Sequence, residues 1–246
     1  MQKFFVKDEQ IKENRIEITG TDVNHIVNVL RMRKEDTVQI NNLSTSENYI
    51  AEIIEYSNER ITCKVIEKIA SKSETNVDIH IYQGLPKADK MELIIQKTTE
   101  IGVKKIIPVS MERCIVKLDE KDSLKKVERW QKISEVAAKQ SKRDIIPKIE
   151  NVIKISEVYT KLREYDLFIV CYEEEKKKTL KEVLKSNTIA RKIGVLIGPE
   201  GGIDISEIQK LKENGAIIVT LGNRILRTET APIVIASNII YELEDN

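Results

Sequence analysis

Several features of metal-binding, secreted and membrane proteins are scarce in this sequence. Only two of its 246 residues are histidine, and its three cysteines, Cys63, Cys114 and Cys171, lie far apart without a CxxC pair. This scarcity argues against a structural zinc site and favours a reduced, cytoplasmic setting. No apolar run approaches the ~18 residues that a membrane span requires. The first ten residues, MQKFFVKDEQ, also lack the continuous apolar stretch of a signal peptide.

The charge balance excludes a polycation but is uneven along the chain. The formal net charge is only +1. Residues 71–150 contain 17 Lys and Arg against 13 Asp and Glu, whereas the segments 1–70 and 151–246 are slightly acidic. A basic middle third can meet the phosphates of a nucleic acid, and solvated surface lysines explain it equally well. Charge alone therefore leaves both interpretations open.

The pattern of residues 1–70 predicts a small β-barrel. Five short runs, FFVK, RIEITG, DTVQIN, YIAEIIEY and ITCKVIEKI, have the β-branched, alternating character of strands and are separated by polar turns. Between them, TDVNHIVNVLRM places Val23, Ile26 and Leu30 at helical spacing, with Thr21 as the expected N-cap. Several short strands with one helix are typical of a small barrel.

After a polar stretch at 70–76, which reads as a linker, the pattern changes to alternating strands and helices. The predicted strands are VDIHIYQ, KKIIPV, DLFIVCY, KIGVLIG and AIIVTLG. The predicted helices are DKMELIIQKTTEIG, SLKKVERWQKISEVAAKQS, EEKKKTLKEVLKS, DISEIQKLKENG and APIVIASNIIYEL. This alternation predicts a mostly parallel sheet covered by helices on both faces. The run EEEKKK is interpreted as a solvated helix start, with Glu174 and Lys178 at i,i+4 spacing.

Glycine is sparse, yet three of the nine glycines lie within 198–202, in the stretch VLIGPEGGID. This loop follows a predicted buried strand, and Asp204 with Glu207 forms a capping box that opens the next helix. It therefore lies at the carboxyl end of a strand, which is where open α/β sheets bind ligands. Glycines there let a flat ligand approach the backbone N–H groups. A tight turn without a ligand is the alternative.

A second loop of the same kind follows the next predicted strand, in TLGNRILRTETAP. It places Arg224 and Arg227 beside Glu229, with apolar residues in a loop that should face water. Thr230 is the expected N-cap of the last helix, with Pro232 in its first turn. Apolar loop residues beside charged ones are typical of a pocket wall. Two such loops on adjacent strands predict one composite site.

These motifs resemble a bacterial family of the SPOUT class that methylates N3 of a uracil in 16S ribosomal RNA (the RsmE type). LIGPEGG at 196–202 and LGNRILRTETA at 221–231 are the most specific features. HIVNVLRMRKED, KMELIIQKTTEIGV, ERCIVK and RWQKISEVAAKQSKRDIIP extend the similarity over the whole chain. The sequence departs from the family pattern at Lys3, where the family often has Arg, and within QSKRD, where it often has Gly.

The resemblance implies an α/β protein of two domains. Residues 1–70 would form a PUA-like, RNA-binding β-barrel. Residues 77–246 would form a SPOUT methyltransferase domain with a mostly parallel sheet and a C-terminal trefoil knot. The expected cofactor is S-adenosylmethionine and the expected partner is 16S ribosomal RNA within the small subunit. A homodimer formed through the knot region is also implied, with no metal and no membrane association.

The resemblance further assigns residues to the cofactor and to the RNA. The cofactor is expected to contact Leu196, Ile197, Gly198, Pro199, Glu200, Gly201, Gly202, Leu221, Gly222, Leu226, Thr228 and Ala231. The apolar members have a purely structural role in the core as their alternative. RNA phosphates are expected to contact Arg31, Arg33, Lys87, Lys90, Arg113, Lys139 and Arg143, of which any could instead be a solvated surface cation. His25 and His80 are interpreted as structural.

The catalytic residues follow from the chemistry of uracil N3, which carries a proton at neutral pH. The enzyme must ease the loss of that proton and stabilise the charge that spreads over O2 and O4. Arg227 and Arg224 suit this task because a guanidinium stays charged and offers several donors. Glu229 is a candidate proton acceptor, but neighbouring arginines would depress its pKa and weaken it as a base. A structural role for Glu229 is the alternative.

Two other functions remain open at this stage. One is a methyltransferase of the same class that acts on transfer RNA or on a ribose 2′-hydroxyl. The barrel-first order and the ILRTETA stretch weigh against it. The other is a ribosome-assembly factor that binds RNA without turnover, against which the two intact glycine loops weigh. The identity of the proton acceptor, the subunit that completes each site and the assembly state of the substrate are left undecided.

Overall fold

The protein has a mixed α/β architecture, described by a computed structural model that covers residues 1–45, 47–57, 59–71 and 73–244. Its contacts divide the chain into two compact units. Unit 1 comprises Met1–Glu74 together with Lys139–Ile145, and unit 2 comprises Thr75–Ala138 together with Ile146–Asn246. A short segment from the middle of the chain therefore belongs to the N-terminal unit.

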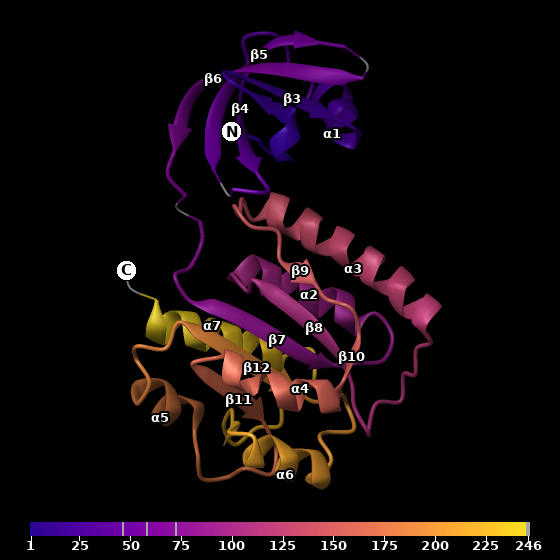
Figure 1. Ribbon diagram of the computed structural model, residues 1–246, viewed down its shortest axis with the longest axis vertical. Coiled ribbons are helices and arrows are strands. Elements are labelled where there is room, and N and C mark those ends of the chain that lie inside the picture. Colours follow the sequence, from indigo (N-terminus) through magenta and orange to yellow (C-terminus); the bar gives the residue numbers. More distant parts are fainter. Residues whose placement is uncertain (46, 58, 72, 245–246) are drawn as a thin grey trace. The chain divides into compact units, whose positions relative to one another are not determined.

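Unit 1 is built on a curled six-stranded sheet in the order β1–β4–β5–β6–β3–β2 (Figure 1). The strands are β1 (Lys3–Val6), β2 (Ile11–Lys12), β3 (Arg15–Thr19), β4 (Thr37–Asn42), β5 (Asn48–Tyr56) and β6 (Arg60–Ile69). β1 pairs in parallel with β4, and the other pairs are antiparallel. Two register shifts between β5 and β6 accommodate the bending of the sheet. The five predicted strands of this region are all present.

The predicted helix of unit 1 forms in two pieces. α1 (Thr21–Asn24) is followed by a π-helical turn, η2 (His25–Val29), and Val23 and Ile26 are buried in the core of the unit. The expected N-cap is wrong, because Thr21 is already the first helical residue. Gly20 takes the cap position with φ 77°, and no side chain caps the helix. Glycine adopts this left-handed backbone without the steric cost of a Cβ.

Unit 2 contains a seven-stranded sheet, counted over the described part of the chain, in which every pairing is parallel. Its main order is β10–β8–β7–β12–β11–β13, and β9 pairs with β8. The strands are β7 (Asp78–Gly84), β8 (Lys105–Ser110), β9 (Lys148–Ile149), β10 (Ile153–Lys154), β11 (Leu167–Cys171), β12 (Lys192–Ile197) and β13 (Ile217–Val219). β11 and β12 are almost wholly buried, which explains their continuous apolar runs.

The helices of unit 2 cover both faces of its sheet. They are α2 (Lys90–Ile101), α3 (Glu120–Gln140, whose last two residues fall in unit 1), α4 (Ile155–Lys161), α5 (Leu180–Lys185), α6 (Ile205–Glu213) and α7 (Ala231–Leu243). α7 packs against α2 and α5, whereas α4 packs against α6 (Figure 1). The strand order with right-handed crossovers places these two groups on opposite faces.

One predicted helix begins later than expected, and the residues before it form a loop at the carboxyl edge of the sheet. EEKKKTLKEVLKS was read as helical throughout, but α5 begins only at Leu180, where Thr179 forms a capping box with Glu182. The preceding residues form turns, so the expected i,i+4 relation of Glu174 and Lys178 does not arise. Glu174 instead accepts a hydrogen bond of 3.0 Å from the Tyr172 hydroxyl. Residues 172–178 are thereby left as a loop at the carboxyl end of β11.

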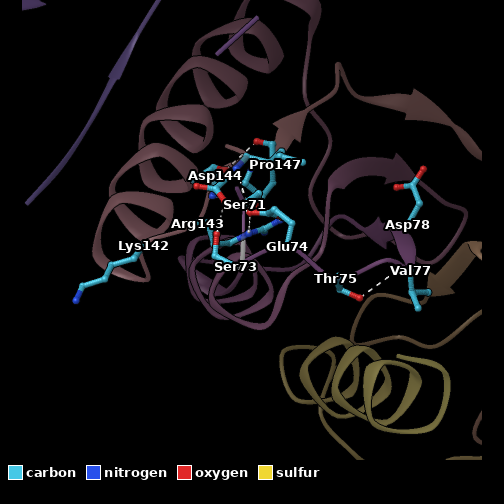
Figure 2. A network of polar contacts seen from close by, with 12 residues as sticks. Ser71, Ser73, Glu74, Thr75, Val77, Asp78, Lys142, Arg143, Asp144 and Pro147 are labelled. Carbon is cyan, nitrogen blue, oxygen red and sulfur yellow. Dashed lines mark hydrogen bonds and ion pairs between the residues drawn. The ribbon is translucent and has the colours of Figure 1, made fainter. Parts of the chain in front are cut away.

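Within unit 1, a polar cluster connects Ser71, Ser73 and Glu74 with the segment 139–145 (Figure 2). The Asp144 carboxylate pairs with the buried Lys3 ammonium and accepts hydrogen bonds from Ser71 and Ser73. Glu74 accepts from the Arg143 guanidinium at 2.6 Å and from the backbone N–H of Asp144 at 2.8 Å. The stretch that the sequence suggested as a plain linker is therefore anchored by hydrogen bonds.

The departure from the family pattern in QSKRD has a backbone counterpart. Lys142 has φ 57°, in the left-handed region that favours glycine. Its side chain extends away from the polar cluster in Figure 2. The Lys142 carbonyl accepts a hydrogen bond from Lys3, at 3.3 Å. The backbone at Lys142 thus has a left-handed conformation, which glycine adopts more readily than lysine does.

Candidate cofactor and catalytic site

A cavity of about 510 Å³ opens at the carboxyl edge of the unit 2 sheet. It is lined by three loops, which carry residues 171–176 after β11, 197–202 after β12, and 220–231 between β13 and α7. Its volume lies within the range typical of small-molecule sites. The two loops that the glycine pattern singled out therefore border the same hollow, and a third loop joins them.

Most of the residues predicted for the cofactor lie in the wall of this cavity. They are Ile197, Gly198, Pro199, Glu200, Gly202, Leu221, Gly222, Leu226, Thr228 and Ala231. Leu196 and Gly201 are not part of the wall. Leu196 is fully buried in β12, and Gly201 packs against Arg113, whose carbonyl oxygen would lie 3.0 Å from a Cβ at this position. Ile197 belongs both to the wall and to the core cluster, so its two interpretations are compatible.

A chain of neutral hydrogen bonds, called the inner link here, joins Gln83, Thr228 and Gly198. The Gln83 amide nitrogen donates to the Thr228 hydroxyl at 2.9 Å, and this hydroxyl donates to the Gly198 carbonyl at 2.7 Å. Gln83 is 0 % exposed and Thr228 is 7 % exposed. Because buried hydrogen bonds are costly to break, the inner link fixes the second loop against the ends of β7 and β12.

A charged counterpart, called the outer link, joins Lys90 to Glu200 and Glu229. The Lys90 Nζ lies 2.9 Å from the Glu200 carboxylate and 3.2 Å from that of Glu229. Glu200 also accepts from the Lys87 backbone N–H at 3.2 Å. Burial acts to raise the pKa of Glu200, but Lys90 and the other donors outweigh it and the pKa is lowered. Hydrogen bonds from the Lys90 ammonium to both carboxylates raise the pKa of Lys90. Lys90 and Glu200 are therefore ionised at neutral pH.

The predicted catalytic arginines lie at the cavity without competing partners. Arg224 and Arg227 both line the wall and are exposed. Within residues 1–45, 47–57, 59–71 and 73–244, neither guanidinium makes a hydrogen bond or an ion pair to the protein. Glu229 was expected to sit beside these arginines, but its ion-pair partner is Lys90. The two guanidinium groups thus remain available to a bound molecule.

The third loop of the cavity was missed by the sequence analysis. It contributes Cys171, Tyr172, Glu173 and Lys176 to the wall. The Glu173 carboxylate lies so close to Gly202 that a Cβ there would be 2.3 Å from its oxygen. Burial raises the pKa of the Cys171 thiol to about 12, which disfavours the reactive thiolate form. The capping box at Thr179 and Glu182 was the available signal, since it ends the loop before α5.

The residues predicted to contact RNA fall into two groups. Arg31, Arg33 and Lys87 are exposed, and the described residues provide no ion-pair partner for their side chains. The other four pair with carboxylates: Lys90 in the outer link, Arg113 with Asp204, Lys139 with Asp22 and Arg143 with Glu74. Arg143 is 2 % exposed, which leaves its guanidinium little access to a phosphate.

His80 and the remaining candidate features have simple structural explanations. His80 contacts Asp78 at 3.0 Å and the Tyr165 hydroxyl at 2.8 Å, and it is not part of the cavity wall.

Among the residues that the structure describes, no cluster of three or more His, Cys, Asp or Glu side chains could hold a metal ion. The helices in the same part of the chain are all too short or too polar to cross a membrane.

Comparison with known protein families matches both parts of the chain. The family described as an RNA methyltransferase domain matches residues 73–240, and the family described as an RNA methyltransferase PUA domain matches residues 18–66. Among curated relatives, the ribosomal RNA small subunit methyltransferase E of Bacillus subtilis is 37 % identical, covering 99 % of this chain and 98 % of its own. The protein of the same name from Mesomycoplasma hyopneumoniae is 33 % identical over 98 % of this chain and all of its own.

Solved structures agree over the same length. The ribosomal RNA small subunit methyltransferase E from Neisseria gonorrhoeae, bound to S-adenosyl methionine, has a TM-score of 0.87 at 28 % identity and covers 98 % of this chain and 97 % of its own. A methyltransferase from Legionella pneumophila in complex with the same cofactor has a TM-score of 0.85 at 26 % identity, covering 99 % and 98 %. With both its domains and nearly all its length accounted for, this chain belongs to the RNA methyltransferase family.

Proposed function

We propose that this protein transfers a methyl group from S-adenosylmethionine to N3 of a uracil in 16S ribosomal RNA. The observation that carries the proposal is the cavity formed by the two predicted glycine loops, in a chain whose relatives are named ribosomal RNA small subunit methyltransferase E. The relative from Neisseria gonorrhoeae, described as bound to S-adenosyl methionine, supports the choice of cofactor.

The cavity has the chemistry that this cofactor requires. Ile197, Leu221 and Leu226 offer an apolar wall for the adenine ring, and the open backbone at Gly222 admits close approach, with nothing within 4 Å of a Cβ built there. The Glu173 and Glu200 carboxylates in the wall suit a cationic ligand, because opposite charges attract more strongly away from bulk water. When bound, the cofactor supplies an electrophilic methyl group on its sulfonium.

The chain itself must orient the uracil and accommodate its negative charge. Arg227 and Arg224 are the proposed catalytic groups, because their guanidiniums, which have no partner among the described residues, can donate to O2 and O4 while the N3 proton passes to solvent water. The pairing of Glu229 with Lys90 supports a structural role over that of a base. Alignment of N3 with the methyl group can contribute about 7–11 kcal/mol of the barrier.

The remaining elements of the proposal concern assembly. We assign RNA binding to the barrel of residues 1–70 and methyl transfer to residues 77–246. The course of the chain after the edge strand β13 supports a C-terminal knot. The Thr228 hydroxyl donates a hydrogen bond to the Gly198 carbonyl, and α7 then packs against α2. A homodimer is supported by the exposed Tyr241 on α7. The proposed place of action is the cytoplasm, where small subunits assemble.

A ligand-binding measurement tests the cofactor assignment. At 100 times its dissociation constant, S-adenosylmethionine should stabilise the fold by about 2.7 kcal/mol. For a chain of this size the melting temperature should rise by roughly 5–11 °C. The absence of any shift would favour an RNA-binding factor without turnover.

The target is tested in cells that lack the protein. Their 16S RNA should lose one methyl group that blocks reverse transcription at a single uracil, and wild-type protein should restore the block. Arg227→Ala should fail to restore it while the dissociation constant for the cofactor stays within about tenfold. Persistent modification in the deletion strain would show that the assigned target is wrong, and restoration by Arg227→Ala would remove its catalytic role.

A further inference from the structure

We propose that Lys90 is a positioning residue for the cofactor site, holding its two glycine loops together as the shared counter-ion of Glu200 and Glu229. This proposal deepens the proposed function, on which its cofactor-binding consequence rests. It replaces the expectation that Lys90 contacts an RNA phosphate. The contacts that carry it are the two ion pairs of the outer link, at 2.9 Å and 3.2 Å.

The three charged groups come from three different elements. Lys90 is the first residue of α2, Glu200 lies in the loop after β12, and Glu229 lies in the loop before α7. The Lys90 side chain is 27 % exposed, and those of Glu200 and Glu229 are 25 % and 16 % exposed. Since all three are mostly withdrawn from water, the ion pairs are screened less than surface pairs.

The local backbone holds Lys90 in place for this task. Glu200 accepts from the Lys87 N–H, so the turn before α2 is bonded to the same carboxylate. Gly84, at the end of β7, contacts Pro199 so closely that an added Cβ would be 2.7 Å from the Pro199 ring. The turn before α2 and the end of β7 therefore both contact the first glycine loop, and Lys90 adds a contact to Glu229.

The outer link complements the inner link. Gln83, Thr228 and Gly198 join the same two loops to the end of β7 by neutral hydrogen bonds on the buried side. One Glu229 carboxylate oxygen, Oε2, is buried, and among the described residues its only charged partner is the Lys90 ammonium, at ion-pair distance. If Lys90 were neutral, the Glu200 and Glu229 carboxylates would lie near each other without their shared cation, and their repulsion would push the loops apart.

The test compares Lys90→Met, which keeps the length of the side chain, with Lys90→Arg and with the control Lys97→Met. Lys97 lies on the same helix but pairs with Glu100 away from the cavity. Without ligand, Lys90→Met should exchange the amide hydrogens of 200–202 and 228–231 at least about tenfold faster than the wild type. Lys90→Arg and Lys97→Met should remain near the wild-type rate. Unchanged exchange in Lys90→Met would overturn the proposal, whatever the ligand of the cavity.

The second readout distinguishes charge from packing. Lys90→Met should weaken S-adenosylmethionine binding about tenfold, and adding Glu229→Gln to it should restore affinity to within about threefold, because the repulsion between the two carboxylates is removed. If the added substitution weakens binding further, the shared-counter-ion role is wrong. Small-subunit RNA should bind Lys90→Met as tightly as the wild type; a weaker, less salt-dependent complex would instead assign Lys90 to RNA. Failure of the wild type itself to bind the cofactor would count against the proposed function alone, since the exchange experiment needs no ligand.

Discussion

Thr228 connects three parts of the cofactor site through one hydroxyl group. It accepts from Gln83 and donates to the Gly198 carbonyl, and both partners are buried or nearly so. Thr228→Val keeps the shape of the side chain but leaves one N–H of Gln83 and the Gly198 carbonyl without this partner. We expect the free energy of unfolding to fall by about 1–3 kcal/mol, measured by chemical denaturation.

The neighbouring Thr230 offers a matched control. Its hydroxyl was expected to cap α7, but no side-chain cap is present, because Thr230 itself has a helical backbone with φ −88° and ψ −38°. Thr230→Val should therefore change stability much less than Thr228→Val. Equal losses in the two variants would contradict the role of the inner link.

Asp144 gives unit 1 a pH-dependent stability. Burial acts to raise its pKa, but Lys3, Ser71 and Ser73 outweigh this effect, and the folded-state pKa is lowered from 3.8. A lowered pKa stabilises the fold above the unfolded value, and this contribution is lost as the pH falls through the folded value. Asp144→Asn should lose about 3–5 kcal/mol at pH 7, since Lys3 would remain buried without its partner.

The same variant provides the test of sign. The difference in unfolding free energy between wild type and Asp144→Asn should shrink as the pH falls below about 4, because the wild-type carboxyl then becomes neutral as well. Glu9→Gln, which removes an exposed partner of Lys7, should show little difference at any pH. A gap that widens toward acid would contradict the assigned direction.

Local chemistry explains which residue roles could be predicted from the sequence. Asp204 and Glu207 form the expected capping box, and Gly102 ends α2 as a C-cap with φ 126°, because both signals act within a few residues. The partnership of Lys90 with Glu229 spans 139 positions and has no local signal. The contact of Glu173 with Gly202 is similarly long-range, which is why the third loop was missed.

At the scale of elements, the end of β7 and the loop after β12 are packed without spare room. A Cβ on Gly84 would lie 2.7 Å from both the nitrogen and the ring Cδ of Pro199. Gly84→Ala must therefore displace the first glycine loop. We expect it to destabilise the fold by about 1–3 kcal/mol and also to weaken S-adenosylmethionine binding, measured by calorimetry.

Gly194→Ala is the comparison that separates stability from binding. A Cβ at this position in β12 would lie 2.4 Å from the Phe168 ring, among the aromatic residues Tyr165 and Tyr82 and apart from the cavity wall. It should destabilise the fold to a similar degree while cofactor affinity remains near that of the wild type. Equal loss of affinity in both variants would show that Gly84→Ala weakens cofactor binding only through general destabilisation of the fold.

Element boundaries were predictable where hydrophobic periodicity was long. α7 occupies the predicted APIVIASNIIYEL, and β12 ends within one residue of the predicted KIGVLIG. The two-residue strands β2, β9 and β10 were not anticipated, because so short a segment shows no period. The order of the strands also requires pairings between distant segments, such as β7 with β12, that no local pattern contains.

For the molecule as a whole, the formal net charge of only +1 gives little general attraction for RNA, so local groups of exposed cations are the proposed phosphate contacts. Arg31 and Arg33 are exposed and unpaired within the described ranges, unlike Arg143. Arg31→Gln with Arg33→Gln should weaken binding of 16S RNA. It should also flatten the plot of log affinity against log salt by about 0.7 per arginine.

Two variants serve as references in this titration. Arg15→Gln removes an exposed charge of unit 1 that no RNA contact is assigned to, and it should leave the salt slope unchanged. Arg143→Gln should instead destabilise unit 1 through loss of its pair with Glu74. An unchanged slope in the double variant would remove Arg31 and Arg33 from the RNA-binding surface.

The pairing of Lys3 with Asp144 has a consequence for synthesis on the ribosome. The two residues are 141 positions apart, yet they meet inside the same compact unit. During translation, Lys3 leaves the exit tunnel long before Asp144 is synthesised. At that stage the Lys3 ammonium on β1 has no Asp144 carboxylate to pair with. Unit 1 can therefore complete its fold only after more than half of the polypeptide has emerged. It cannot fold completely as an N-terminal domain before the segment that contains Asp144 is translated.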